Sequence, residues 1–174
     1  RVSSTPASAL PGLDMDATGA RSLFDGFDGC VAVQLDGPHD GALQNIRVVG
    51  GGASDDVLPS VIVLGGNKSA AVRNVVLDHP TTIGLFVQGD SVDVENVLVT
   101  APAEVGILFA EGSFRSRDLE VTDPKRGGIG IKEGGKLVAR GSTRVRWAPS
   151  VPIAKPEDNA QAGFFVGGEL EVVS

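Results

Sequence analysis

Short runs of alternating apolar and polar residues recur with a fixed spacing of 22 residues between positions 70 and 132. Alternation with a period of two places successive side chains on opposite faces of a β-strand, so each run predicts a short strand with one buried face. Six columns of mostly aliphatic residues are predicted to point inward: Ala70/Val92/Phe114, Val72/Val94/Ser116, Val75/Val97/Leu119, Leu77/Val99/Val121, Leu85/Ile107/Ile129 and Val87/Phe109/Ile131. A repeat of this length predicts stacked units that bury one continuous core together.

Polar and turn-forming residues recur at the same spacing. Asn74, Asn96 and Asp118 form one column, and prolines and glycines form two others. Because side-chain amides satisfy turn backbone groups as well as one another, the asparagine column predicts a ladder at a bend. The pattern continues with insertions upstream, at 43–48 and 61–66, and downstream, at 163–168.

A period near 22, short strands with aliphatic columns and an asparagine at a corner resemble the right-handed parallel β-helix of the pectin-lyase-like superfamily. The resemblance covers residues 28–174 and implies an all-β solenoid of about six coils. Residues 1–27 are then expected to form an N-terminal cap that protects the open end from edge pairing. The chain is predicted to be a single domain overall.

Composition limits the classes of partner. Fifteen basic against 22 acidic residues give a net charge of −7, which disfavours a nucleic-acid partner. The single cysteine, Cys30, excludes an intrachain disulfide, and only two histidines accompany it, so a Cys/His metal cage is excluded. There is no run of about 18 apolar residues, so no membrane insertion is expected.

Two long insertions fall at one corner of the repeat and define a rim, the best candidate for a functional surface. Trp147, the only tryptophan, either stacks on a sugar ring there or anchors the loop at 146–162. Asp55, Asp56 and Asp78 are candidate Ca²⁺ ligands, with solvated loop acids as the alternative. The rim residues are Asp55, Asp56, Asp78, His79, Glu104, Asp123, Lys125, Arg126, Trp147, Lys155, Glu157 and Asp158.

Outward positions of the repeat carry charges of alternating sign. One column has Asp93 beside Arg115, and another has Arg73, Glu95, Arg117 and Arg140. A polysaccharide lyase of this fold is expected to use an Arg or Lys as base, which makes Asp93, Arg115 and Arg117 catalytic candidates. Cross-strand ion pairing on a solvated sheet is the alternative.

A third outward column is apolar, and a solvated face would not have this composition. Either the N-terminal segment or the loop at 146–162 covers it, or it is an interface with another chain or with a neighbouring domain that the sequence does not include. The residues placed in this column are Ala32, Val63, Phe86, Leu108, Gly130 and Phe165.

Known catalytic motifs are missing from the sequence, including a polygalacturonase-like histidine context and a phosphate-binding loop. The sequence therefore predicts a non-catalytic β-helix module that binds a glycan or a partner protein through the rim or the apolar column. The alternative is a polysaccharide lyase or glycoside hydrolase acting on an acidic polysaccharide. The resemblance also implies an extracellular or cell-surface location.

Overall fold

The computed structural model describes residues 24–26, 31, 33–37, 41–53, 58–65, 69–147 and 162–173. These residues are all-β, without a helix, and their strands belong to one eleven-stranded sheet in which every strand pairing is parallel. The predicted all-β class and parallel pairing are confirmed. The strands are β1 (Phe24–Gly26), β2 (Val33–Gly37), β3 (Gly41–Gly50), β4 (Val61–Gly65), β5 (Ala70–Asp78), β6 (Leu85–Thr100), β7 (Val105–Thr122), β8 (Gly127–Ile131), β9 (Gly135–Arg146), β10 (Ala162–Val166) and β11 (Glu169–Val173).

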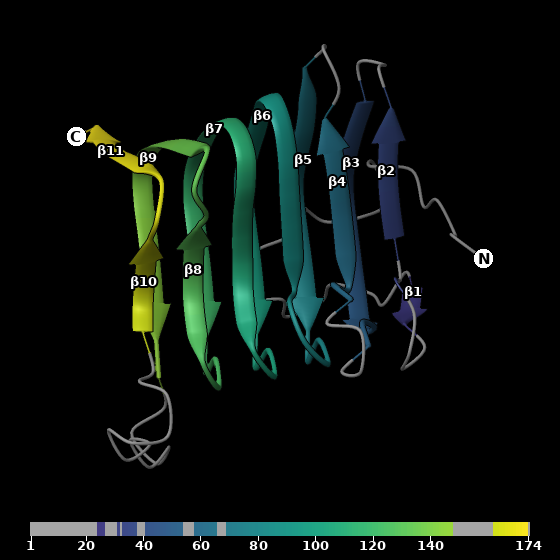
Figure 1. The fold of residues 1–174 in the computed structure, drawn as a ribbon. Helices are drawn as coiled ribbons and strands as arrows, with labels where there is room; N and C mark the ends of the chain where they lie inside the picture. Colours follow the sequence, from purple (N-terminus) through teal and green to yellow (C-terminus); the bar gives the residue numbers. More distant parts are fainter. Residues whose placement is uncertain are drawn as a thin grey trace.

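The strands stack in two facing rows (Figure 1). One row contains β2, β4, β8 and β10 with the first parts of β6 and β7, and the other contains β1, β3, β5, β9 and β11 with the second parts of β6 and β7. We call each of the following a layer: β2 with β3, β4 with β5, β6, β7, β8 with β9, and β10 with β11. In the middle layers, paired residues are 22 apart, as for Val72 with Val94 and Val94 with Ser116.

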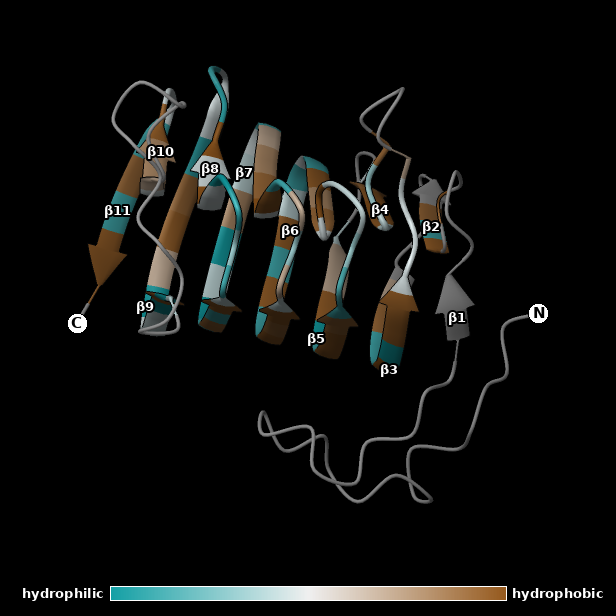
Figure 2. Cartoon of the chain, turned by 90° about the horizontal axis from the view of Figure 1, so that it is seen from below, coloured by the Kyte–Doolittle hydropathy of each residue, from teal (hydrophilic) through white to brown (hydrophobic). Residues whose placement is uncertain are grey.

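The hydrophobic core lies between the two rows. All the residues of the six predicted inward columns are buried, with exposed fractions of 5% or less, so these columns are confirmed. The rings of Phe109 and Phe114 pack at a centroid distance of 5.1 Å inside this core. Figure 2 shows hydrophobic and hydrophilic segments following one another along β5, β6 and β7, as expected for strands with one face in the core.

An asparagine ladder marks a bend in the second row of strands. Asn45, Asn74, Asn96 and Asp118 all have φ between 53° and 56°, the left-handed region that Asn and Asp tolerate better than other side chains. The amide Nδ2 of Asn96 donates to Asn74 Oδ1 at 2.8 Å, and Asn74 Nδ2 donates to Asn45 Oδ1 at 2.9 Å. The predicted ladder is thus confirmed between Asn74 and Asn96 and extends upstream to Asn45, whereas Asp118 shares the bend and accepts a hydrogen bond from Ser142 N instead.

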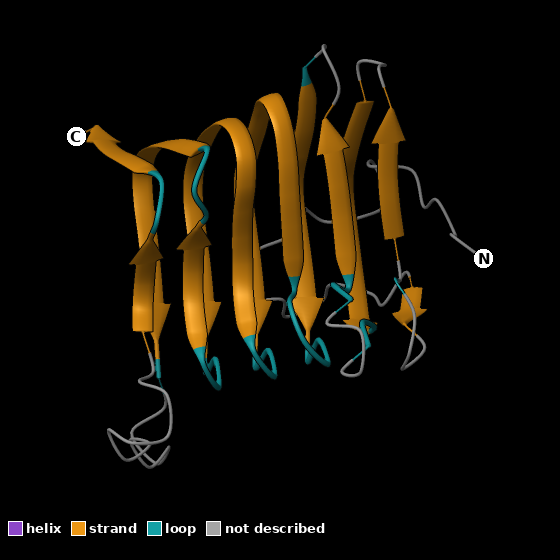
Figure 3. Cartoon of the chain, viewed as in Figure 1, coloured by secondary structure: helices purple, strands orange, loops and turns teal. Residues whose placement is uncertain are grey.

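Turns at one edge of the stack connect the second row to the first row of the next layer (Figure 3). These turns, at residues 79–84, 101–104 and 123–126, lie on one another through backbone hydrogen bonds. Ala103 N donates to Pro80 O at 2.9 Å, and Lys125 N donates to Pro102 O at 3.1 Å. Residues far apart in sequence therefore share this edge.

The predicted N-terminal cap at 1–27 lies outside the described residues except for β1. This strand pairs in parallel with the end of β3, from Val48 to Gly50. The cap itself stays a prediction. Within the described segments there is no helix that could cross a membrane.

Candidate functional site

The predicted rim corresponds to the edge formed by the stacked turns. The structure brings His79, Glu104, Lys125 and Arg126 to this edge, where Arg126 Nη1 lies 3.4 Å from Glu104 Oε1. Asp123 lies at the start of the last of these turns. Five other rim residues lie outside the described part of the chain: Asp55, Asp56, Lys155, Glu157 and Asp158.

The Trp147 side chain is hydrogen-bonded to this edge. Its indole Nε1 donates to the carbonyl of Pro124 at 3.0 Å, and its ring lies beside Gly163 of β10. The side chain is half-buried, and its polar atom is already used within the protein. This geometry agrees with an anchoring role, and sugar stacking by the remaining ring surface stays a prediction.

Asp78 has partners within the sheet. Its Oδ2 accepts a hydrogen bond from Arg47 Nε at 2.7 Å, and its Oδ1 accepts one from the Thr100 hydroxyl. Its side chain is only 11% exposed. The described residues contain no group of three His, Cys, Asp or Glu side chains arranged for a metal ion. A Ca²⁺ site therefore stays a prediction that depends on Asp55 and Asp56.

Among the described residues, the apolar outward column differs from the prediction at one position, and Ala32 lies outside the described part of the chain. Val63 pairs with Val87 and is fully buried in the core, so its predicted outward placement is wrong. Ile62 pairs with Phe86 and occupies the outward position instead. The reason is the register of β4, in which Val61 rather than Ile62 aligns with inward Leu85.

Within the apolar outward column, one side chain covers its neighbours. A side chain at Gly130 would overlap the ring of Phe165, so the ring lies over the glycine, and Leu108 borders the same space. Leu108 is consequently only 5% exposed although its position faces outward, and it offers little surface to a partner. Phe86 is half-buried and Phe165 is 36% exposed.

The outward face of β5, β6, β7 and β9 carries a groove of about 300 Å³. Adjacent strands supply its charges: β6 provides two carboxylates, and the neighbouring strands provide four guanidinium groups. Arg115 makes a two-point contact with Asp93, with Nε to Oδ1 at 2.7 Å and Nη2 to Oδ2 at 3.4 Å. The lining residues are Arg73, Asp93, Val94, Glu95, Arg115, Ser116, Arg117 and Arg140.

We call this hollow the arginine groove. At one end of it, positive charges outnumber negative charges. Glu95 lies between Arg73 and Arg117, at 3.7 and 3.9 Å from their nearest nitrogens. Arg140 of β9 is directly paired in register with Arg117 of β7, and no described carboxylate lies within 4.0 Å of Arg140. Two like charges at directly paired positions repel each other, and an anion placed between them would relieve that repulsion.

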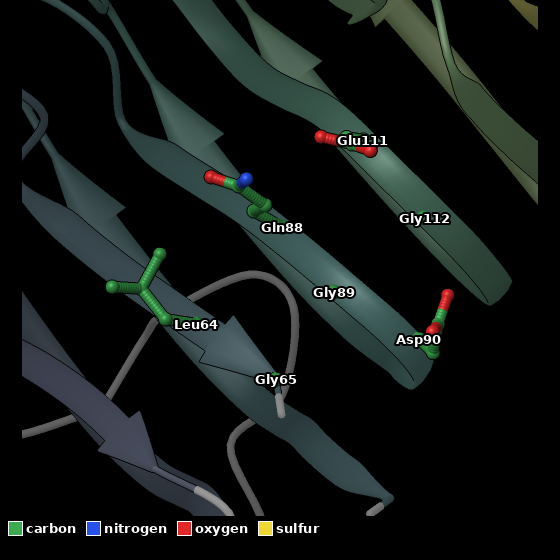
Figure 4. A pocket seen from close by; sticks show the side chains of 7 residues that line it. All are labelled: Leu64, Gly65, Gln88, Gly89, Asp90, Glu111 and Gly112. Carbon is green, nitrogen blue, oxygen red and sulfur yellow. The ribbon is translucent and has the colours of Figure 1, made fainter. Parts of the chain in front are cut away.

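A second hollow of about 330 Å³ lies at a corner of the stack, where Gly65, Gly89 and Gly112 follow one another (Figure 4). A Cβ at Gly89 would overlap the backbone of Gly65, so this corner requires glycine. Leu64, Gln88 and Glu111 lie in a row beside it on successive strands, and Asp90 follows Gly89 within β6. Two carboxylates and one amide on an open corner give it a weakly acidic character.

Comparisons with known proteins assign no family to this architecture. The chain matches no protein-family model, no curated protein and no solved structure.

Proposed function

We propose that this chain is a right-handed parallel β-helix of about six coils and that it acts as a non-catalytic module binding an acidic polysaccharide. The 22-residue offset between paired strands and the asparagine ladder support the coil assignment. The proposed binding surface is the arginine groove rather than the rim. Such a module would act outside the cell or at its surface.

The observation that carries this proposal is the register pair of Arg117 and Arg140. Neighbouring strands of a sheet are about 4.8 Å apart, so a linear polyanion running along the stack meets arginine or acidic side chains in successive rows. Guanidinium groups bind carboxylates through two parallel hydrogen bonds, which suits the uronate groups of acidic sugars. Arg140 has no described carboxylate within 4.0 Å, and Arg117 shares the single carboxylate of Glu95 with Arg73.

The same contacts favour binding over catalysis. Arg115, a candidate base, is held by both carboxylate oxygens of Asp93, and Arg117 lies beside Glu95. A guanidinium group has five N–H donors and no acceptor, which suits it to holding an anion rather than to taking up a proton. Cleavage of a polysaccharide therefore becomes an outcome of the test rather than the proposal.

The test is binding of polygalacturonate, with neutral dextran as the control polymer, measured by isothermal titration calorimetry at two salt concentrations. We expect the double variant Arg117→Gln/Arg140→Gln to bind polygalacturonate at least about tenfold more weakly, because two charge-assisted contacts are lost. Lys132→Gln, which removes an exposed positive charge outside the groove, is the matched control and is expected to change affinity less than about twofold.

Four outcomes would overturn the proposal. If the wild-type protein does not bind polygalacturonate, the proposal has no basis. If the groove variant and Lys132→Gln weaken binding equally, the binding is general charge attraction rather than recognition by the groove. Loss of binding in Arg126→Gln, with the groove variant unaffected, would move the site to the rim. Size-exclusion chromatography measures the length of the polymer after the titration, and a shortened polymer would show that the protein is an enzyme.

A further inference from the structure

The positive part of the arginine groove is short along the stack. One outward column of the groove follows the backbone register from layer to layer, and its described members are, in order, Gln44, Arg73, Glu95, Arg117, Arg140 and Val173. Within this described column, Arg117 and Arg140 are the only two cations that are direct neighbours. Both side chains are exposed, so an anion in solution can reach them.

Acidic side chains lie on both sides of this arginine pair. Glu95 precedes Arg117 in the column at 3.9 Å from its guanidinium, and the Glu95 side chain is 43% exposed. On the other side, the uncharged Val173 pairs with Arg140, and the exposed Glu171 lies two residues before Val173 on the same face of β11. A polyanion that extended past the pair in either direction would therefore bring its next carboxylate toward one of these glutamates, and like charges repel.

The size of the groove agrees with a short ligand. Its volume of about 300 Å³ lies at the lower end of the range of about 300–1,000 Å³ that is typical of ligand pockets. Neighbouring strands are about 4.8 Å apart, and one unit of an extended sugar chain has a similar length. Two consecutive sugar units therefore match the two strands that carry Arg117 and Arg140.

We propose that the arginine groove recognises two adjacent acidic sugar units and disfavours a third, an inference that rests on the proposed function of the same site. The carboxylate of one unit binds Arg117 and that of the next binds Arg140, each through two parallel hydrogen bonds. A neutral sugar unit beside the pair brings hydroxyl groups that donate to Glu95, without a carboxylate that Glu95 repels. The ligand class is therefore a polysaccharide with paired acidic units between neutral units, rather than a continuous polyuronate.

Oligogalacturonates of one, two, four and six units distinguish a short site from an extended one, and isothermal titration calorimetry measures the affinity of each. We expect two units to bind at least about tenfold more tightly than one, because a second charge-assisted contact is added. From two units to six we expect a gain of less than about fivefold, since six units offer only five overlapping pairs of neighbours to the same site.

Glu95 provides the variant that should extend the site. Glu95→Gln removes the carboxylate between Arg73 and Arg117, so that a longer chain can continue along the column to Arg73. We expect the ratio of the four-unit to the two-unit affinity to rise at least about fivefold in this variant. Glu111→Gln removes an exposed carboxylate outside the groove and is the matched control, expected to change that ratio less than about twofold. Circular dichroism checks that both variants keep the wild-type strand content.

Failure of the length limit and failure of the proposed function give different results. If the wild-type protein binds none of these chains, or if Arg117→Gln/Arg140→Gln binds them equally well, both proposals are overturned. If binding depends on the two arginines but six units bind more than about tenfold more tightly than two, only the length limit is overturned. An unchanged affinity ratio in Glu95→Gln, or an equal change in Glu111→Gln, would also overturn the length limit, because Glu95 would not be its cause.

Discussion

The layers formed by β6 and β7 differ from the layer of β10 and β11 in burial rather than in the kind of side chain. Phe109 in β7 is fully buried, whereas Phe164 in β10, also on the inward face, is 45% exposed. The difference arises because each layer contributes only one side of its own core and the next layer contributes the other. The free energy of unfolding therefore depends on contacts between neighbouring layers. Truncation of a side chain should lower it more when more layers contact that side chain.

The largest contrast is expected between two phenylalanine truncations. Phe109→Ala removes a ring from the closed core, where it packs against Phe114, and we expect it to lower the free energy of unfolding by about 3–5 kcal/mol. Phe164→Ala removes a half-exposed ring and should cost under about 1 kcal/mol. Urea denaturation followed by circular dichroism measures both, and equal losses would contradict the layer dependence.

A smaller contrast separates two glycines with positive φ. A Cβ at Gly112 would overlap the carbonyl of Gly89, whereas the nearest atom to a Cβ at Gly134 is 3.5 Å away. We expect Gly112→Ala to cost roughly 3 kcal/mol and Gly134→Ala roughly 1 kcal/mol, the latter from backbone conformation alone. Thermal unfolding of the two variants provides the comparison. A Gly134→Ala variant less stable than Gly112→Ala would show that contact with the neighbouring layer is not the deciding factor.

Two substitutions in neighbouring layers of the asparagine ladder should change the free energy of unfolding in opposite directions. Asp118 accepts a hydrogen bond from Ser142 N at 2.9 Å, but a carboxylate has no proton to donate to Asn96. Asp118→Asn supplies that donor and should stabilise the protein by about 1 kcal/mol. Asn96→Asp removes the donor to Asn74 and should destabilise it by a similar amount. Denaturation midpoints that move in the same direction for both variants would refute the ladder as an energetic unit.

The smallest effect is expected on the solvated face. The pair of Arg115 and Asp93 has good geometry, but the arginine side chain is 59% exposed. Arg115→Gln should therefore lower stability by under about 1 kcal/mol, and by less at high salt. Denaturation at low and high ionic strength measures this change. A loss comparable to that of Phe109→Ala would mean that the outward face contributes as much as the core.

The sequence was sufficient for the repeating part of the fold. Strand alternation and a fixed period identified the inward columns of β5, β6 and β7 and the asparagine bend, because identical positions in successive repeats experience identical surroundings. The same alternation also predicted that the charged residues lining the groove face outward. Arg117 and Arg140 also lay in one predicted column, and the backbone register pairs them directly; only the structure shows the irregularity after Arg117, where Asp118 lies opposite Gly141 and Ser142.

Positions next to insertions were decided by the tertiary structure. The insertion before β4 changes the phase of the alternation, so the sequence placed Val63 outward, whereas the hydrogen-bond register buries Val63 and turns the half-buried Ile62 outward. The burial of Leu108 depends on the Phe165 ring lying over Gly130, and the position of Trp147 depends on its hydrogen bond to Pro124. A periodic pattern determines which face of a strand is buried, whereas contacts between different layers determine what remains accessible on the outside.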